Sequence, residues 1–129
     1  MPDTSTFFER VAALRREGQP FAVATVVARR APVSAHLGDR AIVFADGRME
    51  GFVGGACSRE IVRKQALEAL RARAARLVSI RPDASDAGEA SQDRVFVPMT
   101  CASEGAVDVY VEPIVRPRPH HTLETLACA

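Results

Sequence analysis

Apolar residues along this chain of 129 residues change their spacing several times, and each change predicts a helix or a strand. The first pattern has helical spacing, with apolar side chains at Phe7, Val11 and Leu14. Thr6 and Glu9 fit a capping box, and Gly18 follows as a stop signal. These signals predict a short helix over residues 7–17.

Three later segments favour strands and a hairpin. Residues 21–28 are almost continuously apolar and rich in β-branched side chains, which is typical of a strand buried on both faces in the middle of a sheet. Residues 41–45 and 48–53 flank Asp46-Gly47, a strong turn signal for a β-hairpin.

The second half of the chain predicts one long helix followed by short strands. Residues 58–75 contain neither Gly nor Pro and repeat apolar side chains on one side, so they should form the main helix. Residues 77–80, 94–97 and 107–111 have the composition or alternation of strands.

Together these segments predict a single α+β domain. We expect a mixed or antiparallel sheet of about five or six strands, flanked by two helices. The domain should occupy residues 1–115, and residues 116–129 have the Pro, Arg and His content of a tail. A chain of 129 residues is also the usual length of one domain.

Composition excludes several classes of function. The formal net charge is +1, and the chain has one Tyr and no Trp, so nucleic-acid binding is not expected. No apolar run approaches the ~18 residues that would cross a bilayer, and the N-terminus lacks the pattern of a secretory signal. We therefore expect a cytoplasmic protein without membrane association.

The three cysteines do not form a familiar disulfide or zinc pattern. Cys57, Cys101 and Cys128 have no C-x-x-C spacing and no neighbouring pair of histidines. They are expected to be free thiols.

The most informative segment is a glycine-rich turn before the main helix, with Gly54, Gly55 and Cys57 followed by Ser58 and Arg59. A helix N-terminus supplies unpaired N–H groups and a positive dipole, which favour an anion and lower the pKa of a thiol. The turn lacks the series of glycines or the Gly-Lys-Ser/Thr ending of a nucleotide site. A tight turn with a small buried cysteine is an equally weighted interpretation.

Two further candidates lie near the end of the domain. Thr100 and Cys101 belong to a loop of small polar residues, and loops carry function more often than cores do. Glu112 ends a strand before Pro113, where it can serve the strand edge or hydrogen-bond a polar heterocycle. A buried thiol at Cys101 and a structural carboxylate at Glu112 are the alternatives.

Several of these motifs occur in an order that resembles a known family. They are Gly-Phe-Val-Gly-Gly-Ala-Cys at residues 51–57, Pro-Met-Thr-Cys at 98–101 and Val-Tyr-Val-Glu-Pro at 109–113. The chain is similar over residues 21–113 to the N-terminal domain of the XdhC/CoxI family, accessory proteins of xanthine dehydrogenase and carbon monoxide dehydrogenase maturation. Members usually continue into a Rossmann-like domain, which is not expected within this chain.

The resemblance implies a chaperone rather than a turnover enzyme. Its cargo would be the molybdenum cofactor, molybdopterin, on its way into a molybdenum hydroxylase client. The residues expected near this cofactor are Gly54, Gly55, Cys57, Ser58, Arg59, Thr100, Cys101 and Glu112. Among them, Cys57 and Cys101 are the candidate contacts to the metal, because thiolates are soft ligands. The further partners to consider are a cysteine desulfurase, a separate Rossmann-like chain and a second copy of this chain.

Two other functions stay open at this point. The basic side chains Arg63, Lys64 and Arg71 of the main helix can dock the hydroxylase or a sulfur donor without any cofactor. Alternatively, Cys57 and Cys101 can act as a thiol redox sensor, provided that their Cα atoms come within ~7 Å of each other.

Overall fold

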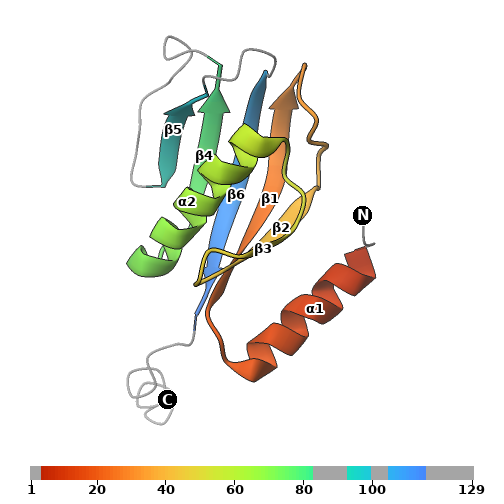
Figure 1. The fold of residues 1–129 in the computed structure, drawn as a ribbon, viewed down its shortest axis with the longest axis vertical. Helices are drawn as coiled ribbons and strands as arrows, with labels where there is room; N and C mark the ends of the chain where they lie inside the picture. Colours follow the sequence, from red (N-terminus) through yellow and green to blue (C-terminus); the bar gives the residue numbers. More distant parts are fainter. Residues whose placement is uncertain (1–3, 83–92, 100–104, 116–129) are drawn as a thin grey trace, which may run out of the picture.

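The structure, a computed structural model, describes residues 4–82, 93–99 and 105–115. These residues form two helices and six strands (Figure 1). In chain order they are α1 (Thr4–Glu17), β1 (Phe21–Arg30), β2 (Arg40–Phe44), β3 (Met49–Gly51), α2 (Ala56–Ala72), β4 (Arg76–Arg81), β5 (Arg94–Pro98) and β6 (Ala106–Ile114).

All six strands belong to one open sheet in the order β3-β2-β1-β6-β4-β5. The pairing of β4 with β5 is parallel and the other pairings are antiparallel, so the sheet is mixed. The predicted α+β domain is therefore confirmed.

Strand β1 lies near the centre of the sheet, as its apolar run predicts, because it pairs with β2 on one side and β6 on the other. Its burial is less complete than predicted. Ala22, Ala24 and Val26 are buried, whereas Val27 is 50% exposed. The difference arises because helix α1 packs against only the first part of β1, through Phe21 and Val23, on the face opposite α2.

The predicted hairpin forms at Asp46-Gly47. The N–H of Phe44 donates to the carbonyl of Arg48 (2.8 Å), and the N–H of Gly47 donates to the carbonyl of Phe44 (2.9 Å). The returning strand is shorter than predicted, because β3 ends at Gly51 and residues 52–55 turn into α2.

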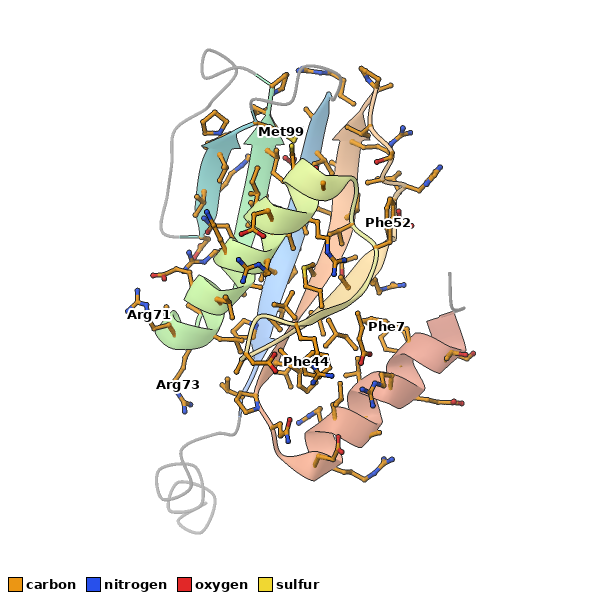
Figure 2. The ribbon with its side chains drawn as sticks, viewed as in Figure 1. Phe7, Phe44, Phe52, Arg71, Arg73 and Met99 are labelled. Carbon is orange, nitrogen blue, oxygen red and sulfur yellow. The ribbon has the colours of Figure 1, made fainter. Side chains whose placement is uncertain are left out.

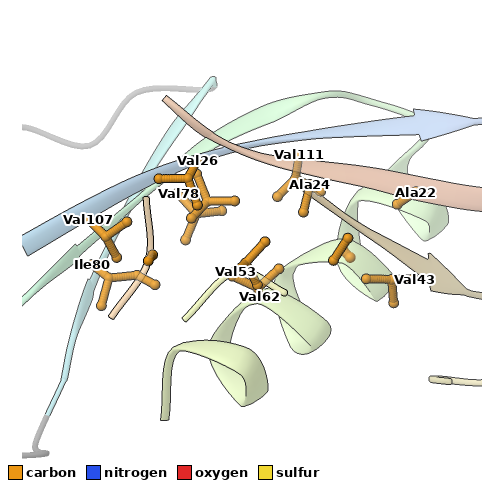
Figure 3. Packing of buried hydrophobic residues seen from close by; sticks show 14 of the residues in the cluster. Ala22, Ala24, Val26, Val43, Val53, Val62, Val78, Ile80, Val107 and Val111 are labelled. Atoms are coloured by element: carbon orange, nitrogen blue, oxygen red, sulfur yellow. The ribbon is translucent and has the colours of Figure 1, made fainter. Parts of the chain in front are cut away.

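Helix α2 covers one face of the sheet and forms the larger core with it. Its side chains Val62, Ala66 and Ala69 are fully buried at helical spacing. The cluster contains apolar residues from β1, β2, β4 and β6, most of them Ala or Val: Ala22, Ala24, Val26, Val43, Val78, Ile80, Val107, Val109 and Val111. Figure 3 shows most of these residues packed together. Small side chains let the helix lie close to the strands.

Helix α1 packs on the opposite face, because side chains alternate along β2: Val43 belongs to the α2 core, whereas Ile42 and Phe44 pack with Leu14. The expected capping box was wrong, since the helix begins at Thr4 and Thr6 therefore lies inside it. The stop at Gly18 is confirmed by its N–H bonds to the carbonyls of Leu14 and Arg15.

No helix in the described parts of the chain is both long and apolar enough to cross a membrane.

Candidate functional site

The glycine-rich turn delivers the chain from β3 into the N-terminus of α2. Gly54 has a φ of +126°, a conformation that side-chain-bearing residues rarely adopt. A Cβ built there would lie 3.0 Å from Cβ of Ser58 and 3.2 Å from its Oγ. The turn therefore needs glycine at position 54, both for its backbone and for its contact with α2.

The first turn of α2 begins without a side-chain cap. Gly55 is the N-cap residue, and it has no side chain to accept a hydrogen bond from the first amides. Its carbonyl accepts the first helical bond, from the N–H of Arg59 at 2.9 Å. Residues 56–58 thus present the N–H groups and the positive dipole end that favour an anion.

Ser58 connects this turn to the segment that precedes the second cysteine loop. Its side chain is 1% exposed, and its hydroxyl lies 3.6 Å from Sδ of Met99, which is also buried. Figure 2 shows Met99 beside the first turns of α2. The N–H of Met99 donates in turn to the carbonyl of Arg81 at the end of β4 (2.7 Å). Thr100 and Cys101 lie outside the described residues.

Cys57 occupies the first turn of α2, half-buried and packed against the main core. The structure records it as disulfide-bonded, so the expectation of a free thiol at this position was wrong. The absence of C-x-x-C spacing excludes only local pairings, and a fold can bring distant cysteines together. Cys57 is the only cysteine among the described residues, and a sulfur held in a disulfide is not a thiolate ligand.

The other two candidates lie apart from the buried part of the turn. The side chain of Arg59 is exposed on the surface of α2. Glu112 is exposed near the far end of β6, where it pairs with Val23. Because Val107 pairs with Ile80 near the Met99 end of the sheet, Glu112 lies roughly 17 Å further along β6 at ~3.4 Å per residue. The structure does not bring Glu112 to the glycine turn.

Two of the four basic residues of α2 are paired with acids on the same helix. Arg63 makes two hydrogen bonds to Glu60 (2.6 and 2.9 Å), and Arg71 pairs with Glu68 in the same i,i+3 arrangement. The hydrogen bond from Arg63 lowers the pKa of Glu60, and that from Arg71 lowers the pKa of Glu68. These acids offset much of the positive charge that the docking hypothesis needs.

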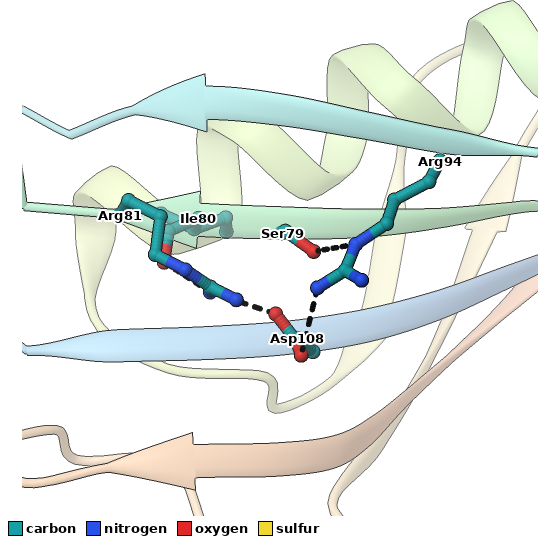
Figure 4. A network of polar contacts seen from close by, with 5 residues as sticks. All are labelled: Ser79, Ile80, Arg81, Arg94 and Asp108. Carbon is teal, nitrogen blue, oxygen red and sulfur yellow. Dashed lines mark hydrogen bonds and ion pairs between the residues drawn. The ribbon is translucent and has the colours of Figure 1, made fainter. Parts of the chain in front are cut away.

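A polar network on the sheet face opposite α2 was not found from the sequence. Asp108 accepts a hydrogen bond from Arg81 (2.7 Å) and lies 3.7 Å from Arg94, which also donates to Ser79 at 2.9 Å (Figure 4). The sequence does contain a signal for the position of Asp108. In a strand Asp108 alternates with Val107 and Val109, so its side chain must face away from the α2 core.

Metal binding has no ready-made site in the parts that the structure describes. Within residues 4–82, 93–99 and 105–115, no three His, Cys, Asp or Glu side chains come together in a metal-binding group.

The fold and the turn thus define an α+β domain with a disulfide-bonded cysteine at an uncapped helix N-terminus. The model of the XdhC and CoxI family matches residues 14–81, more than half of the chain, which includes this turn and all of α2. The chain belongs to the XdhC and CoxI family.

A solved structure shows the same fold at low sequence identity. It is a protein from Bacillus halodurans whose crystal structure is described as that of a xanthine dehydrogenase, 20% identical with a TM-score of 0.60. The match covers 81% of this chain and 29% of the other, so this chain spans less than a third of that protein. No curated protein matched the chain.

Proposed function

We propose that this domain binds the molybdenum cofactor as cargo and serves the maturation of a molybdenum hydroxylase of the xanthine dehydrogenase or carbon monoxide dehydrogenase type. In this role it is an accessory protein and not a turnover enzyme. Membership of the XdhC and CoxI family carries the proposal, because the matched residues contain the cysteine turn. The name of the Bacillus halodurans protein points to the same enzyme system.

The geometry of the α2 turn supports the binding of a phosphate-bearing ligand. The N–H groups of residues 56–58 and the helix dipole favour a phosphate group, and Arg59 on the same turn adds a guanidinium. Cys57 stands in this turn, next to the dipole end that stabilises a thiolate. Glu112 is too distant to take part at the same point, so the proposal rests on the turn.

The disulfide determines when the sulfur of Cys57 can act as a metal ligand. Cys57 can offer a thiolate to the metal end of the cofactor only after its disulfide has been reduced. A dithiol reductant supplies two electrons and two protons, becomes a disulfide itself, and leaves two protein thiols. We therefore expect the reduced form of the domain to hold the cofactor more tightly than the oxidised form.

Anaerobic equilibrium dialysis with molybdenum cofactor tests this proposal. The experiment compares reduced and oxidised wild type with the variants Cys57→Ala and Arg59→Gln, and Cys128→Ala serves as the matched control outside the motifs. Circular dichroism checks that each variant is folded. We expect near-stoichiometric binding by the reduced wild type and the control, and at least tenfold weaker binding by Cys57→Ala. Absence of binding by reduced, folded wild type would overturn the proposal.

A thiol redox switch is the second candidate, and the disulfide at Cys57 favours it. The contact between Ser58 and Met99 brings the chain two residues before Cys101 to the first turn of α2. We predict that Cys101 is the partner. Alkylation after stepwise reduction, followed by mass spectrometry of Cys57→Ser, Cys101→Ser and Cys128→Ser, identifies the pair. A disulfide that persists in Cys101→Ser would exclude this pairing.

A further inference from the structure

The segment between β1 and β2, residues 31–39, forms a wall beside the glycine turn. Ala35 is buried, and its Cβ lies 3.8 Å from a Cβ built on Gly54. Near the start of the segment, the carbonyl of Pro32 accepts the N–H of Gly105, which comes shortly after Cys101 in the sequence. Residues 31–39 therefore contact both parts of the chain that carry the cysteine motifs.

A buried carboxylate fixes the end of this segment. The side chain of Asp39 is 3% exposed, and its Oδ2 accepts the backbone N–H of His36 at 2.8 Å. The N–H of Asp39 donates in return to the carbonyl of His36 (3.0 Å). A carboxylate is costly to bury unless it is paired and hydrogen-bonded. The imidazole supplies such a pair, because its Nδ1 lies 3.8 Å from the same oxygen, an ion-pair distance for a protonated histidine.

His36 lies on the side of the sheet where α2 begins. The guanidinium of Arg40 lies over two phenylalanine rings of α1, so the preceding residue, Asp39, points to the α2 side. The alternation extends to Asp39, because its carbonyl accepts the N–H of Val26 and continues the pairing of β2 with β1. The imidazole of His36, at ion-pair distance from Asp39, is therefore on the same side as the glycine turn, and Ala35 next to it in the chain contacts that turn.

The imidazole of His36 is open to a ligand. Its side chain is 78% exposed, and Nδ1 is the ring nitrogen beside the carboxylate of Asp39. The other nitrogen, Nε2, is an N–H donor when the ring is protonated. Hydrogen bonds from a cationic donor to a phosphate are shorter and about twice as strong as those between neutral groups. Because Asp39 is buried, the group that meets a ligand is the imidazole.

We propose that His36 is a further binding residue of the cofactor site and donates from Nε2 to the cofactor phosphate at the N-terminus of α2. Asp39 is the positioning residue that holds the ring. The inference rests on the proposed function, in which the N–H groups of residues 56–58 bind this phosphate. It adds the segment between β1 and β2 to a site that otherwise consists of the α2 turn.

Anaerobic equilibrium dialysis of molybdenum cofactor against the reduced full chain tests the role of His36. The measurement is made at about pH 6, where histidine carries much of its second proton. His36→Gln should weaken binding about tenfold, because a hydrogen bond to a charged group is lost. His120→Gln is the matched control: it removes an imidazole from the tail and should leave the affinity within about twofold of wild type. Circular dichroism checks the fold, and the exposed side chain of His36 can be replaced without disturbing the core.

The results separate this inference from the proposed function. If reduced, folded wild type binds no cofactor, the proposed function fails and the role of His36 fails with it. If wild type binds and His36→Gln binds equally well, the role of His36 alone is overturned. Equal weakening by His36→Gln and His120→Gln would show that the effect is not specific to this position and would also overturn it.

A double-mutant cycle tests Asp39 as a positioning residue. Asp39→Asn keeps the size of the side chain and an oxygen that can accept the N–H of residue 36, but it removes the charge. It should weaken binding about threefold or more in the wild-type background and have no further effect in the His36→Gln background, because it acts through the ring. Equal weakening in both backgrounds would mean that Asp39 only supports the backbone, and its positioning role would be overturned.

Discussion

Replacement of Gly54 by alanine tests whether the turn before α2 is as tightly specified as its geometry indicates. Gly54 combines a φ of +126° with a close approach to Ser58, and Gly38 separates the two effects. Gly38 also has a positive φ, +86°, but a Cβ built there meets no atom within 4 Å. Gly38→Ala therefore measures backbone strain alone, and Gly54→Ala measures strain together with the contact.

The magnitudes follow from these two contributions. A residue with a side chain in a disfavoured backbone region costs about 1–3 kcal/mol. At Gly54 the new methyl group would lie 3.0 Å from Cβ of Ser58, and overpacking of this kind adds about 1–3 kcal/mol. We expect Gly38→Ala to lower the free energy of unfolding by about 1–2 kcal/mol and Gly54→Ala by about 3–4 kcal/mol. A domain with about 5–15 kcal/mol of stability remains folded in either case.

Urea unfolding followed by circular dichroism at 222 nm provides the measurement, with all proteins under the same reducing conditions. For a slope of about 1–3 kcal/mol per molar urea, a difference of 2 kcal/mol moves the midpoint by about 1 M. The slopes should stay equal, so that the midpoints report stability alone. If Gly54→Ala were no less stable than Gly38→Ala, the contact with Ser58 would not constrain the turn, and the reasoning would be refuted.

Two other predictions concern the core and the attachment of α1. Val62 is fully buried, so Val62→Ala should lower the free energy of unfolding in urea by about 2 kcal/mol. Lys64 is exposed on the same helix, and Lys64→Ala should change the free energy of unfolding by less than about 0.5 kcal/mol. Equal effects of the two substitutions would contradict the burial of Val62 against the sheet. Arg10 makes two hydrogen bonds to Glu50 (2.8 and 3.1 Å), and these bonds lower the pKa of the Glu50 carboxyl below the usual 4.5. The pair therefore stabilises the fold above pH 4.5, and this stabilisation is lost as the pH falls through the lowered pKa. Both side chains are exposed, so Glu50→Gln should cost less than about 1 kcal/mol at pH 7, and a stability gap that stayed constant on acidification would refute this origin.

Most elements of the fold could be predicted from local pattern, because each one carries its own period or turn signal. The strand over residues 21–28, the hairpin at Asp46-Gly47 and the stop at Gly18 all depend on interactions between close neighbours in sequence. The start of α2 was predicted two residues too late. Its N-cap is Gly55, and glycine lacks the capping side chain by which the start of a helix can be predicted from the sequence.

The arrangement of the candidate site could not be predicted in the same way. The order of the strands decides which segments become neighbours, and that order depends on pairings between residues far apart in the chain. It brings Met99 to Ser58 but leaves Glu112 at the other end of β6. Likewise, the arginines at the ends of β1 and β4 become a cluster only because β6 lies between these strands.

Arg81 connects the two faces of the sheet at the edge where β4 ends. Its carbonyl accepts the N–H of Met99, which contacts Ser58 in α2, while its side chain holds Asp108 on the opposite face. The backbone bond to Met99 does not use the side chain of Arg81, so different parts of one residue hold the α2 side and the Asp108 side of β4.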